Sequence, residues 1–463
     1  MKYTTLVNKD NKFKENFLNK IELVYTVNIN NNPLQLEKET YENYLKLKSF
    51  LKDNDIEIGL TGAYRSIEYQ TKVYEKSLDE NGDEYTKNHV AEPFYSEHHT
   101  GLCLDFGVIN NGICNSKNLT ELEEKQFNFI HKIIHKFGFI LRYPKDKENI
   151  TKYSYEPWHI RYVGEIPATI MYENNLTLEE YLKDFSGVLY INKPKGITSF
   201  DVVNEISHSF GIKKVGHTGT LDPLAEGVML VAIGKATKIV ELLTAKDKEY
   251  IAGVKLGIKT DTYDITGNIL DTKEIPNNIN LEETLNSFKK TYLQEVPIYS
   301  AVKVDGKKLY EYARNNKSVE LPKKEVTIKE IELLNQNNDE FTFRTLVTKG
   351  CYIRSLIVDI AESINTYATM TSLKRTKQGL VSIEETSTLD DIKNNDYKIH
   401  KIEEVLDYPI IELDEELYFK VSNGVKIPNN YNITDKVIFT HNNKLLGIYI
   451  KENNYLKTWK NFN

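Results

Sequence analysis

Hydrophobic residues recur at two different spacings in the first part of the chain, and each spacing predicts its own kind of element. Residues 102–106 alternate apolar and other side chains, which predicts a strand that turns Asp105 away from its Leu and Phe face. Gly101, just before this strand, permits a tight turn into it. Residues 130–137 carry Ile and Phe at the spacing of one helical face, so a helix is expected there.

The pattern changes where the first part of the chain ends. The sequence LTLEEYLKDF (residues 176–185) predicts an acidic helix, and an apolar strand at 188–191 follows almost without a linker. A Lys-Pro-Lys-Gly turn comes next, and Thr198 or Ser199 is placed to cap a helix that begins near Phe200. We therefore expect two domains that abut.

Later stretches predict the rest of the organisation. Residues 228–233 predict an apolar strand, and residues 236–243 predict a helix with one apolar face. Near the end of the chain, the apolar runs VIFT and LLGIYI flank HNNK, which is a hairpin-like pattern. The expected domains are residues 1–185, 186–405 and 406–463.

Length and composition describe a globular protein of more than one domain. The chain has 463 residues, of which 40% are hydrophobic and 27% charged, so two or three cores are expected. Three scattered cysteines, Cys103, Cys114 and Cys351, do not suit a disulfide framework. There is no apolar signal segment and no run of about 18 apolar residues, so a cytoplasmic protein without a membrane segment is expected.

The charge is distributed unevenly between the two parts. The net charge of −7 argues against a nucleic-acid-binding surface that spans the whole chain. Residues 1–185 carry 23 basic and 29 acidic side chains, which leaves 37 and 38 of the totals of 60 and 67 for residues 186–463. The second part is nearly neutral and has basic stretches such as LKRTKQ, a balance that is compatible with RNA binding.

Three stretches of the first part carry residues that suit a zinc site. A catalytic zinc ion needs three protein ligands, an open position for water and a base nearby. His98 and Asp105 converge only if the residues between them turn into a strand. His159 can supply the third ligand and Glu156 the base, on a stretch that Pro157 keeps out of a helix interior.

A second histidine pair has metal-ligand spacing. His131 and His135 are four residues apart on the predicted helix. However, Lys132 stands where the H-E-x-x-H motif has its glutamate, and both histidines flank the apolar stripe. They are expected to be ordinary surface groups.

Together these stretches resemble the vancomycin-resistance type of zinc D-alanyl-D-alanine carboxypeptidases and dipeptidases. The likeness covers nearly all of residues 5–182 and includes TGAYRSIEYQ, the pattern S-x-H-x-x-G-x-x-x-D in SEHHTGLCLD, FGFILRYP and EPWHIRYVG. The resemblance implies zinc as the cofactor and a D-alanyl-D-alanine-terminated peptide or dipeptide, of the kind found in peptidoglycan precursors, as the substrate. Both carboxypeptidase and dipeptidase action fit it.

The same resemblance implies a role for each motif residue. The zinc ligands would be His98, Asp105 and His159, and the general base that takes a proton from the attacking water would be Glu156. Arg65 would stabilise the oxyanion or hold the substrate, and Ser96 would contact the substrate. His99 occupies a position that the family fills variably. Cys103 occupies one that is usually alanine and is expected to be a packing residue, although a thiol near zinc could alter metal preference or oxidation sensitivity.

The second part carries one carboxylate in a loop rich in Gly and Thr. Asp222 precedes Pro223, which fixes the backbone, within the sequence VGHTGTLDPLAEG. The loop lacks the G-x-x-x-x-G-K-[ST] pattern of a phosphate-binding loop. From this stretch alone, an ordinary Asx-turn and a catalytic aspartate both remain open.

These residues resemble the tRNA pseudouridine-55 synthase family from about residue 186 to 395. The supporting stretches are GHTGTLDPLAEG, INKPKGITS, DKEYIAGVKLGIKTDTYDITG, QEVPIYSAVKVDGKKLYEYAR, TKGCYIRSLIVDIAE and LKRTKQG. The reaction that this resemblance implies breaks the N1–C1′ bond of a uridine and rejoins the base through C5, and it needs no cofactor. A carboxylate nucleophile is sufficient, and attack on the base and attack on the sugar both remain open.

The resemblance also implies the residues around this aspartate. Asp222 would be the nucleophile, Arg354 its charged partner, Tyr250 the residue that stacks on the uracil, and Tyr352 a second packing partner. His217 would hold the flipped nucleotide, and Lys193 would be a structural or backbone-binding residue near the site. Contacts to the T-stem and loop of tRNA would come from some of Lys213, Lys214, Lys307, Lys308, Lys374 and Arg375.

The prediction is therefore two enzymes in one chain. An α+β domain with helices against an antiparallel sheet would carry the zinc peptidase, and an α/β domain with a mixed sheet would carry the tRNA synthase. A small β-rich C-terminal module, which weakly resembles the RNA-contacting module of the synthase family, would complete the chain. The alternative is a synthase alone, whose first domain is a non-catalytic module that binds peptide or tethers the enzyme.

Overall fold

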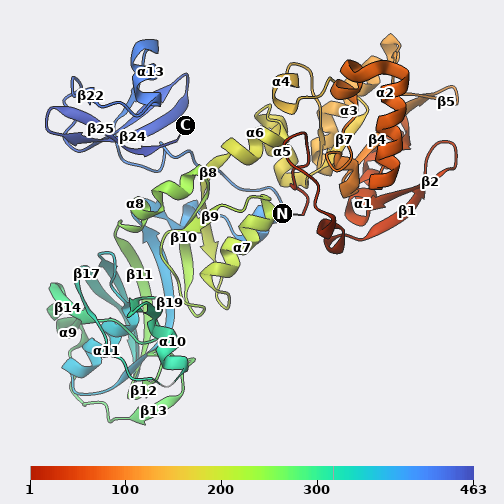
Figure 1. Ribbon diagram of the computed structural model, residues 1–463. Helices are drawn as coiled ribbons and strands as arrows, with labels where there is room; N and C mark the ends of the chain where they lie inside the picture. Colours follow the sequence, from red (N-terminus) through yellow and green to blue (C-terminus); the bar gives the residue numbers. More distant parts are fainter. Residues whose placement is uncertain (1, 316, 463) are drawn as a thin grey trace. The chain divides into compact units, whose positions relative to one another are not determined.

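The computed structural model describes residues 2–315 and 317–462, and these residues form two compact units (Figure 1). The first unit comprises the chain up to residue 185 together with residues 206–214. The second unit comprises residues 186–205 and the chain from residue 215 onwards. Each candidate site described below lies within a single unit.

An antiparallel sheet forms the centre of the first unit. Its strand order is β3-β4-β7-β6, and a short strand, β5, pairs with β4. A separate antiparallel pair, β1–β2, precedes it. The strands are β1 (Leu23–Val27), β2 (Pro33–Glu37), β3 (Glu57–Gly62), β4 (Cys103–Asn110), β5 (Ile113–Asn115), β6 (Phe139–Leu141) and β7 (His159–Tyr162).

Helices cover one face of this sheet. The apolar sides of α1 and α3, with Leu47 and Phe127, pack in one core with Leu104 of β4 and Ile160 of β7. A capping box between Thr120 and Glu123 fixes the start of α3. The helices are α1 (Lys38–Lys52), α2 (Ile67–His89), α3 (Glu121–Ile133), α4 (Glu148–Thr151), α5 (Glu165–Glu173) and α6 (Leu178–Asp184).

The turn that enters β4 has the form expected from the sequence. Residues Glu97–Thr100 make one 3-10 turn, and Gly101 ends it with a φ of 68°. This left-handed conformation favours glycine, and a Cβ at this position would also meet Leu23 Cδ2 at 2.8 Å. β4 then begins at Cys103, so Asp105 lies two residues into the strand.

A nine-stranded mixed sheet is the largest sheet among the described residues of the second unit. Its order is β14-β17-β18-β11-β19-β10-β8, with β20 paired to β19 and β9 to β10. β10 and β19 are parallel, and the other pairs are antiparallel. The strands are β8 (Ser186–Lys193), β9 (Val215–His217), β10 (Glu226–Gly234), β11 (Lys248–Leu256), β14 (Thr291–Glu295), β17 (Lys323–Asn337), β18 (Glu340–Val347), β19 (Ala368–Gln378) and β20 (Val381–Ser382).

Short helices and two small hairpins complete this sheet region. The apolar side of α11, with Leu356 and Ile360, packs on β11 and β18 through Ala252 and Phe343. The hairpins are β12 (Ile258–Thr260) with β13 (Ile269–Thr272), and β15 (Lys303–Val304) with β16 (Lys307–Lys308). The helices are α7 (Ser199–Ser209), α8 (Val240–Thr244), α9 (Leu281–Ser287), α10 (Leu309–Arg314), α11 (Ile353–Ser363) and α12 (Leu389–Lys393).

The end of the chain forms a separate five-stranded sheet with the order β21-β23-β24-β25-β22. The hairpin expected around HNNK joins β23 to β24, and Asn442 and Asn443 take φ values of 50° and 59° in its turn. The elements are β21 (Ile410–Glu412), α13 (Glu415–Ser422), β22 (Ile427–Pro428), β23 (Lys436–His441), β24 (Lys444–Glu452) and β25 (Tyr455–Asn461).

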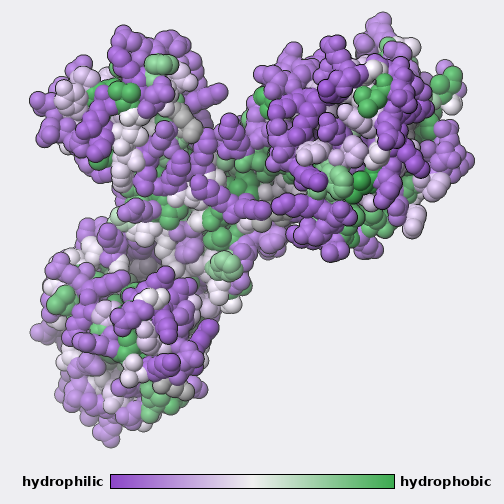
Figure 2. Space-filling model, viewed as in Figure 1, coloured by the Kyte–Doolittle hydropathy of each residue, from purple (hydrophilic) through white to green (hydrophobic). Residues whose placement is uncertain are grey.

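The surface in Figure 2 is mostly hydrophilic, with hydrophobic residues in small patches. Across residues 2–315 and 317–462, none of the helices has the length and apolar content that a membrane span requires.

Candidate metal centre and candidate nucleotide pocket

Asp105 and His159 are direct neighbours in the first sheet, because their Cα atoms are register partners in the β4–β7 pair. His98 reaches the same point from the 3-10 turn. His98 Nε2 lies 3.5 Å from Asp105 Oδ2, and His159 Nδ1 lies 3.0 Å from Asp105 Oδ1. The three expected ligands therefore converge, although 54 residues separate Asp105 from His159.

The outer nitrogen of each histidine is already occupied. His98 Nδ1 is 2.6 Å from the carbonyl oxygen of Ala63, and His159 Nε2 is 2.9 Å from Glu97 Oε1. Such partners fix the ring orientation and turn the other nitrogen toward a common point. Burial is the main reason that the pKa of His98 falls to about 3, which keeps this imidazole neutral.

One carboxylate oxygen of Asp105 has no hydrogen-bond donor among the described residues. Oδ1 is buried and has no hydrogen bond of acceptable geometry among the described residues, although His159 Nδ1 is close. An unpaired buried carboxylate oxygen is costly, and a cation would satisfy it. Two inward imidazole nitrogens and this oxygen form a donor set of the kind that holds zinc, so the residues fit that ion.

Glu97 supports the centre from behind, and the sequence analysis did not identify it. Its Oε2 accepts hydrogen bonds from Arg142 Nε at 2.8 Å and from Arg161 Nη1 at 2.9 Å. Burial opposes ionisation, but the two guanidinium groups hold the pKa of Glu97 well below its usual range. A buried anion thus orients His159. Its position beside His98 is the one signal in the sequence that could have drawn attention to it.

The other expected residues of this site lie around one cavity of about 250 Å³. Arg65 Nη2 donates to Asp105 Oδ2 at 2.9 Å, and Ser96 Oγ accepts from the His98 backbone N–H at 3.3 Å. Glu156 Oε2 is 3.7 Å from His159 Nδ1. Burial raises the pKa of Glu156 to about 7, which is the range that suits a general base. The walls include Arg65, Ser96, His98, Asp105, Glu156 and His159.

Three other histidines of the first unit, His99, His131 and His135, have structural contacts. Both ring nitrogens of His99 are bound to backbone groups, Nδ1 to the Arg65 carbonyl at 2.7 Å and Nε2 to the Phe94 N–H at 3.2 Å. His131 Nε2 is bound to the Pro157 carbonyl at 2.8 Å, and His135 stacks on Tyr172. Both are half-buried rather than fully exposed, and neither belongs to a metal-ligating group among the described residues.

The second unit holds a different kind of site around Asp222. Arg354 Nη2 lies 2.9 Å from Asp222 Oδ2 in a cavity of about 280 Å³. The same guanidinium donates to the carbonyls of Thr262 and Tyr299, each at 2.9 Å. Burial raises the pKa of Asp222, and Arg354 opposes that shift by favouring the ionised form.

Backbone hydrogen bonds hold the loop that carries Asp222. Ser199 Oγ donates to the Leu221 carbonyl at 3.0 Å and accepts from the Leu221 N–H at 2.9 Å. Thr198, rather than Ser199, caps α7 by accepting from the Asp201 N–H at 3.1 Å. The loop is therefore tied to the start of α7.

Lys193 is fully buried behind this loop. Its ammonium donates to the carbonyls of Ala225 at 2.7 Å and Pro194 at 2.9 Å. Burial lowers the pKa of Lys193 to about 8, and Asp222 acts in the opposite direction. Its contacts in the structure are with the loop backbone.

The expected aromatic residues separate into those at the pocket and one outside it. Tyr250 of β11 and Tyr352, which precedes α11, both line the cavity of Asp222. His217 lies on β9 and is not among the described residues that line this cavity. Its Nδ1 is buried and has no hydrogen-bond partner within the described part of the chain.

Two polar residues near Asp222 were not identified from the sequence. Lys248 lines the cavity, donates to the carbonyls of Thr244 and Lys246, and has its pKa lowered to about 8 by burial. Asp264 raises the pKa of Asp222 through its negative charge. Asp264 Oδ1 accepts from the Thr266 N–H at 2.9 Å, which fixes the carboxylate in place.

The residues expected to contact RNA differ in exposure. Lys213, Lys214, Lys307 and Lys374 are exposed, and Lys308 is half-buried beside Tyr310. Arg375 does not fit the expectation of a surface phosphate contact, because it is 1% exposed and its Nε donates to the Val228 carbonyl at 2.6 Å. The reason is strand alternation, since β19 turns Lys374 outward and Arg375 inward.

Two family models match the chain. The D-alanyl-D-alanine carboxypeptidase (VanY) model matches residues 33–165, and the TruB family pseudouridylate synthase N-terminal domain model matches residues 207–353. The chain is 45% identical over 288 residues to a tRNA pseudouridine synthase B of Fusobacterium nucleatum, across 59% of this chain and 99% of the relative. It is 45% identical over 280 residues to that of Oceanobacillus iheyensis, across 57% and 92%.

A solved structure is also similar to part of the chain. It is a vancomycin resistance D,D-pentapeptidase VanY in complex with Zn(II), 26% identical, covering 39% of this chain and 99% of that chain with a TM-score of 0.34. The chain belongs to the tRNA pseudouridine synthase B family and carries, ahead of that region, a domain of the VanY D-alanyl-D-alanine carboxypeptidase family.

Proposed function

We propose that the chain is a bifunctional enzyme that converts uridine 55 in the T-loop of tRNA to pseudouridine and hydrolyses peptides that end in D-alanyl-D-alanine. Residues 1–185 would form the peptidase domain, residues 186–405 the catalytic domain of the synthase, and residues 406–463 an RNA-contacting module. The ion pair between Asp222 and Arg354 in a cavity is the main observation that supports the first activity. The convergence of His98, Asp105 and His159 is the main observation that supports the second.

In the synthase reaction, Asp222 acts as the nucleophile and holds the nucleotide covalently while the base turns. The N1–C1′ bond breaks, a C5–C1′ bond forms, and the proton lost from C5 is balanced by one gained at N1. Arg354 favours the ionised form of the carboxylate against the effect of burial, and Tyr250 stacks on the uracil. The target base must leave its stack to reach the cavity, which costs about a few kcal/mol.

The synthase proposal is tested with a T-arm RNA and the full-length chain. Wild type should form one pseudouridine per RNA at position 55, detected by chemical mapping. Asp222→Asn should form none, because an amide is not a nucleophile of this kind, although it should still bind the RNA. Modification by Asp222→Asn, or modification of wild type at a different uridine, would contradict the assignment.

In the peptidase, His98, Asp105 and His159 would hold zinc, and Glu97 would orient His159. When bound, zinc supplies Lewis-acid chemistry that polarises the scissile carbonyl and makes water a better nucleophile. Glu156 accepts the proton of the attacking water and then delivers it to the leaving amine. Arg65, fixed by Asp105, supplies positive charge next to the developing oxyanion.

The space around this centre favours a peptide longer than a dipeptide. A second cavity of about 670 Å³ shares Lys117, Glu156 and Trp158 with the walls of the first. Peptide residues ahead of the scissile bond could therefore extend along it, which favours carboxypeptidase over dipeptidase action. The three expected zinc ligands and the expected base, Glu156, all line one cavity. A module that only binds peptide would not need this complete set, so the arrangement favours catalysis.

The peptidase proposal is tested by the release of D-alanine from a D-alanyl-D-alanine-terminated pentapeptide. Wild type loaded with one zinc per chain should release it. Glu156→Gln should bind zinc with similar affinity but hydrolyse at least about 100-fold more slowly, as expected for loss of a general base. Zinc-loaded wild type without hydrolysis would contradict the proposal.

A further inference from the structure

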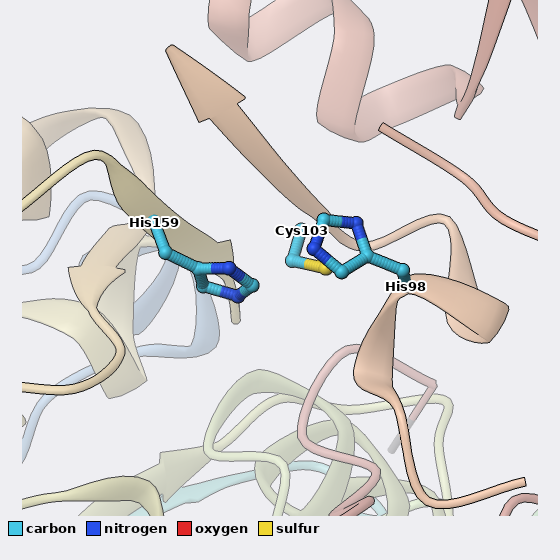
Figure 3. A group of neighbouring side chains, drawn as sticks. All are labelled: His98, Cys103 and His159. Carbon is cyan, nitrogen blue, oxygen red and sulfur yellow. The ribbon is translucent and has the colours of Figure 1, made fainter. Parts of the chain in front are cut away.

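Cys103 lies on the inner side of the proposed metal centre. It is the first residue of β4, two positions before Asp105, so both side chains project from the same face of the strand. The thiol is 0% exposed. One ligand atom from each of His98, Cys103 and His159 lies within 4.8 Å of the others, and Figure 3 shows Cys103 between the two histidines.

The Cys103 thiol and the substrate would reach the metal centre from different sides. His98, Asp105 and His159 line the 250 Å³ cavity, whereas Cys103 is not among the described residues in its walls. The thiol therefore approaches the centre from the protein interior. A ligand on that side leaves the cavity side free for water and substrate.

A second observation at the same point indicates a cation. Asp105 Oδ1 is buried and lacks an adequate hydrogen bond among the described residues, next to the two inward imidazole nitrogens. A thiol that coordinates a metal loses its proton to solvent, so a metal ion would bind here as a thiolate complex. Thiolates select soft or borderline ions.

We propose that Cys103 is a fourth protein ligand of this metal centre, which gives it a His98–Cys103–Asp105–His159 donor set with a preference for thiophilic divalent ions. The inference rests on the proposed metal site of the peptidase. With water or substrate on the cavity side, the ion would be five-coordinate, as catalytic zinc sites can become. Zn–S of about 2.3 Å and Zn–N of about 2.0 Å place the ligand atoms about 3 to 4 Å apart. The ligand atoms of His98, Cys103 and His159 lie within 4.8 Å of one another, so these three side chains would close by about 1 to 2 Å around an ion.

The test is the electronic spectrum of the full-length chain loaded with Co²⁺ in place of zinc. Wild type with one bound Co²⁺ should show an intense thiolate-to-cobalt charge-transfer band in the near ultraviolet, together with the visible bands of a low-symmetry site. Cys103→Ala and Cys103→Ser should lose the near-ultraviolet band and keep both the visible bands and the bound Co²⁺. Cys114→Ala, which changes a half-buried cysteine of the same unit, should keep both features.

Metal competition adds a second readout. Wild type should prefer Cd²⁺ over Zn²⁺ more strongly than Cys103→Ser does, because only the thiolate discriminates between the two ions on softness. Visible bands without a charge-transfer band in wild type would overturn the role of Cys103 and leave the peptidase site intact. A charge-transfer band that persists in Cys103→Ser would also overturn it. If wild type binds no Co²⁺, the metal site itself is wrong and the inference fails with it.

Discussion

Asp222 and Arg354 form an ion pair, with 2.9 Å between Oδ2 and Nη2, on the wall of the cavity in the second unit. The pair matters because burial raises the pKa of Asp222 and favours its neutral form, and Arg354 limits that shift. A neutral carboxyl group is a poor nucleophile. The charge state of Asp222 therefore links the local structure to the rate of isomerisation.

Removal of the positive partner should shift the pH dependence of the synthase. In Arg354→Gln, the largest influence that lowers the pKa of Asp222 is lost, so this pKa rises further. The acid limb of the kcat/KM profile should move to higher pH, and the rate at neutral pH should fall. An acid limb that stays in place would show that Asp222 does not control the rate.

The negative neighbour should have the opposite effect. Asp264 raises the pKa of Asp222, so Asp264→Asn should lower it and move the acid limb to lower pH. Asparagine retains the oxygen that accepts from the Thr266 N–H, which makes this a conservative change. The two variants should thus displace the same limb in opposite directions, and displacement in one common direction would contradict the electrostatic account.

Glu97 should control metal affinity without contacting the metal. Glu97→Gln removes the anion that holds His159 Nε2 and leaves Arg142 and Arg161 without their shared partner. Loss of such a supporting group typically lowers metal affinity about 10–100-fold. Competition with a chelator measures this, and Glu121→Gln, which changes an exposed glutamate of the same unit, should leave the affinity unaltered.

Lys374 and Arg375 are adjacent in sequence but should respond to mutation differently. Lys374→Met should weaken RNA binding and reduce its salt dependence by about one phosphate contact, with little effect on stability. Arg375→Met removes the hydrogen bonds that the buried guanidinium donates to the carbonyls of Val228 and Gly219, and should cost about 1–3 kcal/mol in the free energy of unfolding. Denaturation and filter-binding assays on both variants separate the effects. Equal losses of stability in the two variants would contradict the different roles given to the exposed Lys374 and the buried Arg375.

Removal of the metal should affect only the first unit. Binding to the native state alone stabilises a domain, so a chelator should lower the unfolding temperature of the first unit. The second unit holds no metal-ligating group among its described residues and should unfold unchanged. Calorimetry of the full-length chain distinguishes the two transitions. In His159→Ala the chelator should have no effect on either.

Local features of the metal centre could be predicted from the sequence because short-range rules produce them. The alternation around Asp105 predicted β4, and Gly101 predicted the turn that precedes it. The predicted helices lie where they were expected, but some are less regular than the sequence pattern suggested. Residues 235–239 form a 3-10 turn before the short helix α8, where one continuous helix was expected.

The supporting residues could not be predicted, because they depend on pairing between distant segments. Arg142 and Arg161 meet Glu97 only after β7 has paired with β4 and β6. No spacing in the sequence encodes that meeting. Arg375 is a different case, since the alternation of β19 could have revealed its burial if the basic stretch had been interpreted as a strand.

The central claim is that one chain carries two independent catalytic centres, and a crossed assay tests it most directly. Both pseudouridine formation in a T-arm RNA and D-alanine release should be measured for wild type, Asp222→Asn and His159→Ala, all as full-length protein. The account predicts that wild type performs both reactions, that Asp222→Asn loses only the first, and that His159→Ala loses only the second. If zinc-loaded wild type releases no D-alanine, or if either variant loses both activities while remaining folded, the account of two separate centres is wrong.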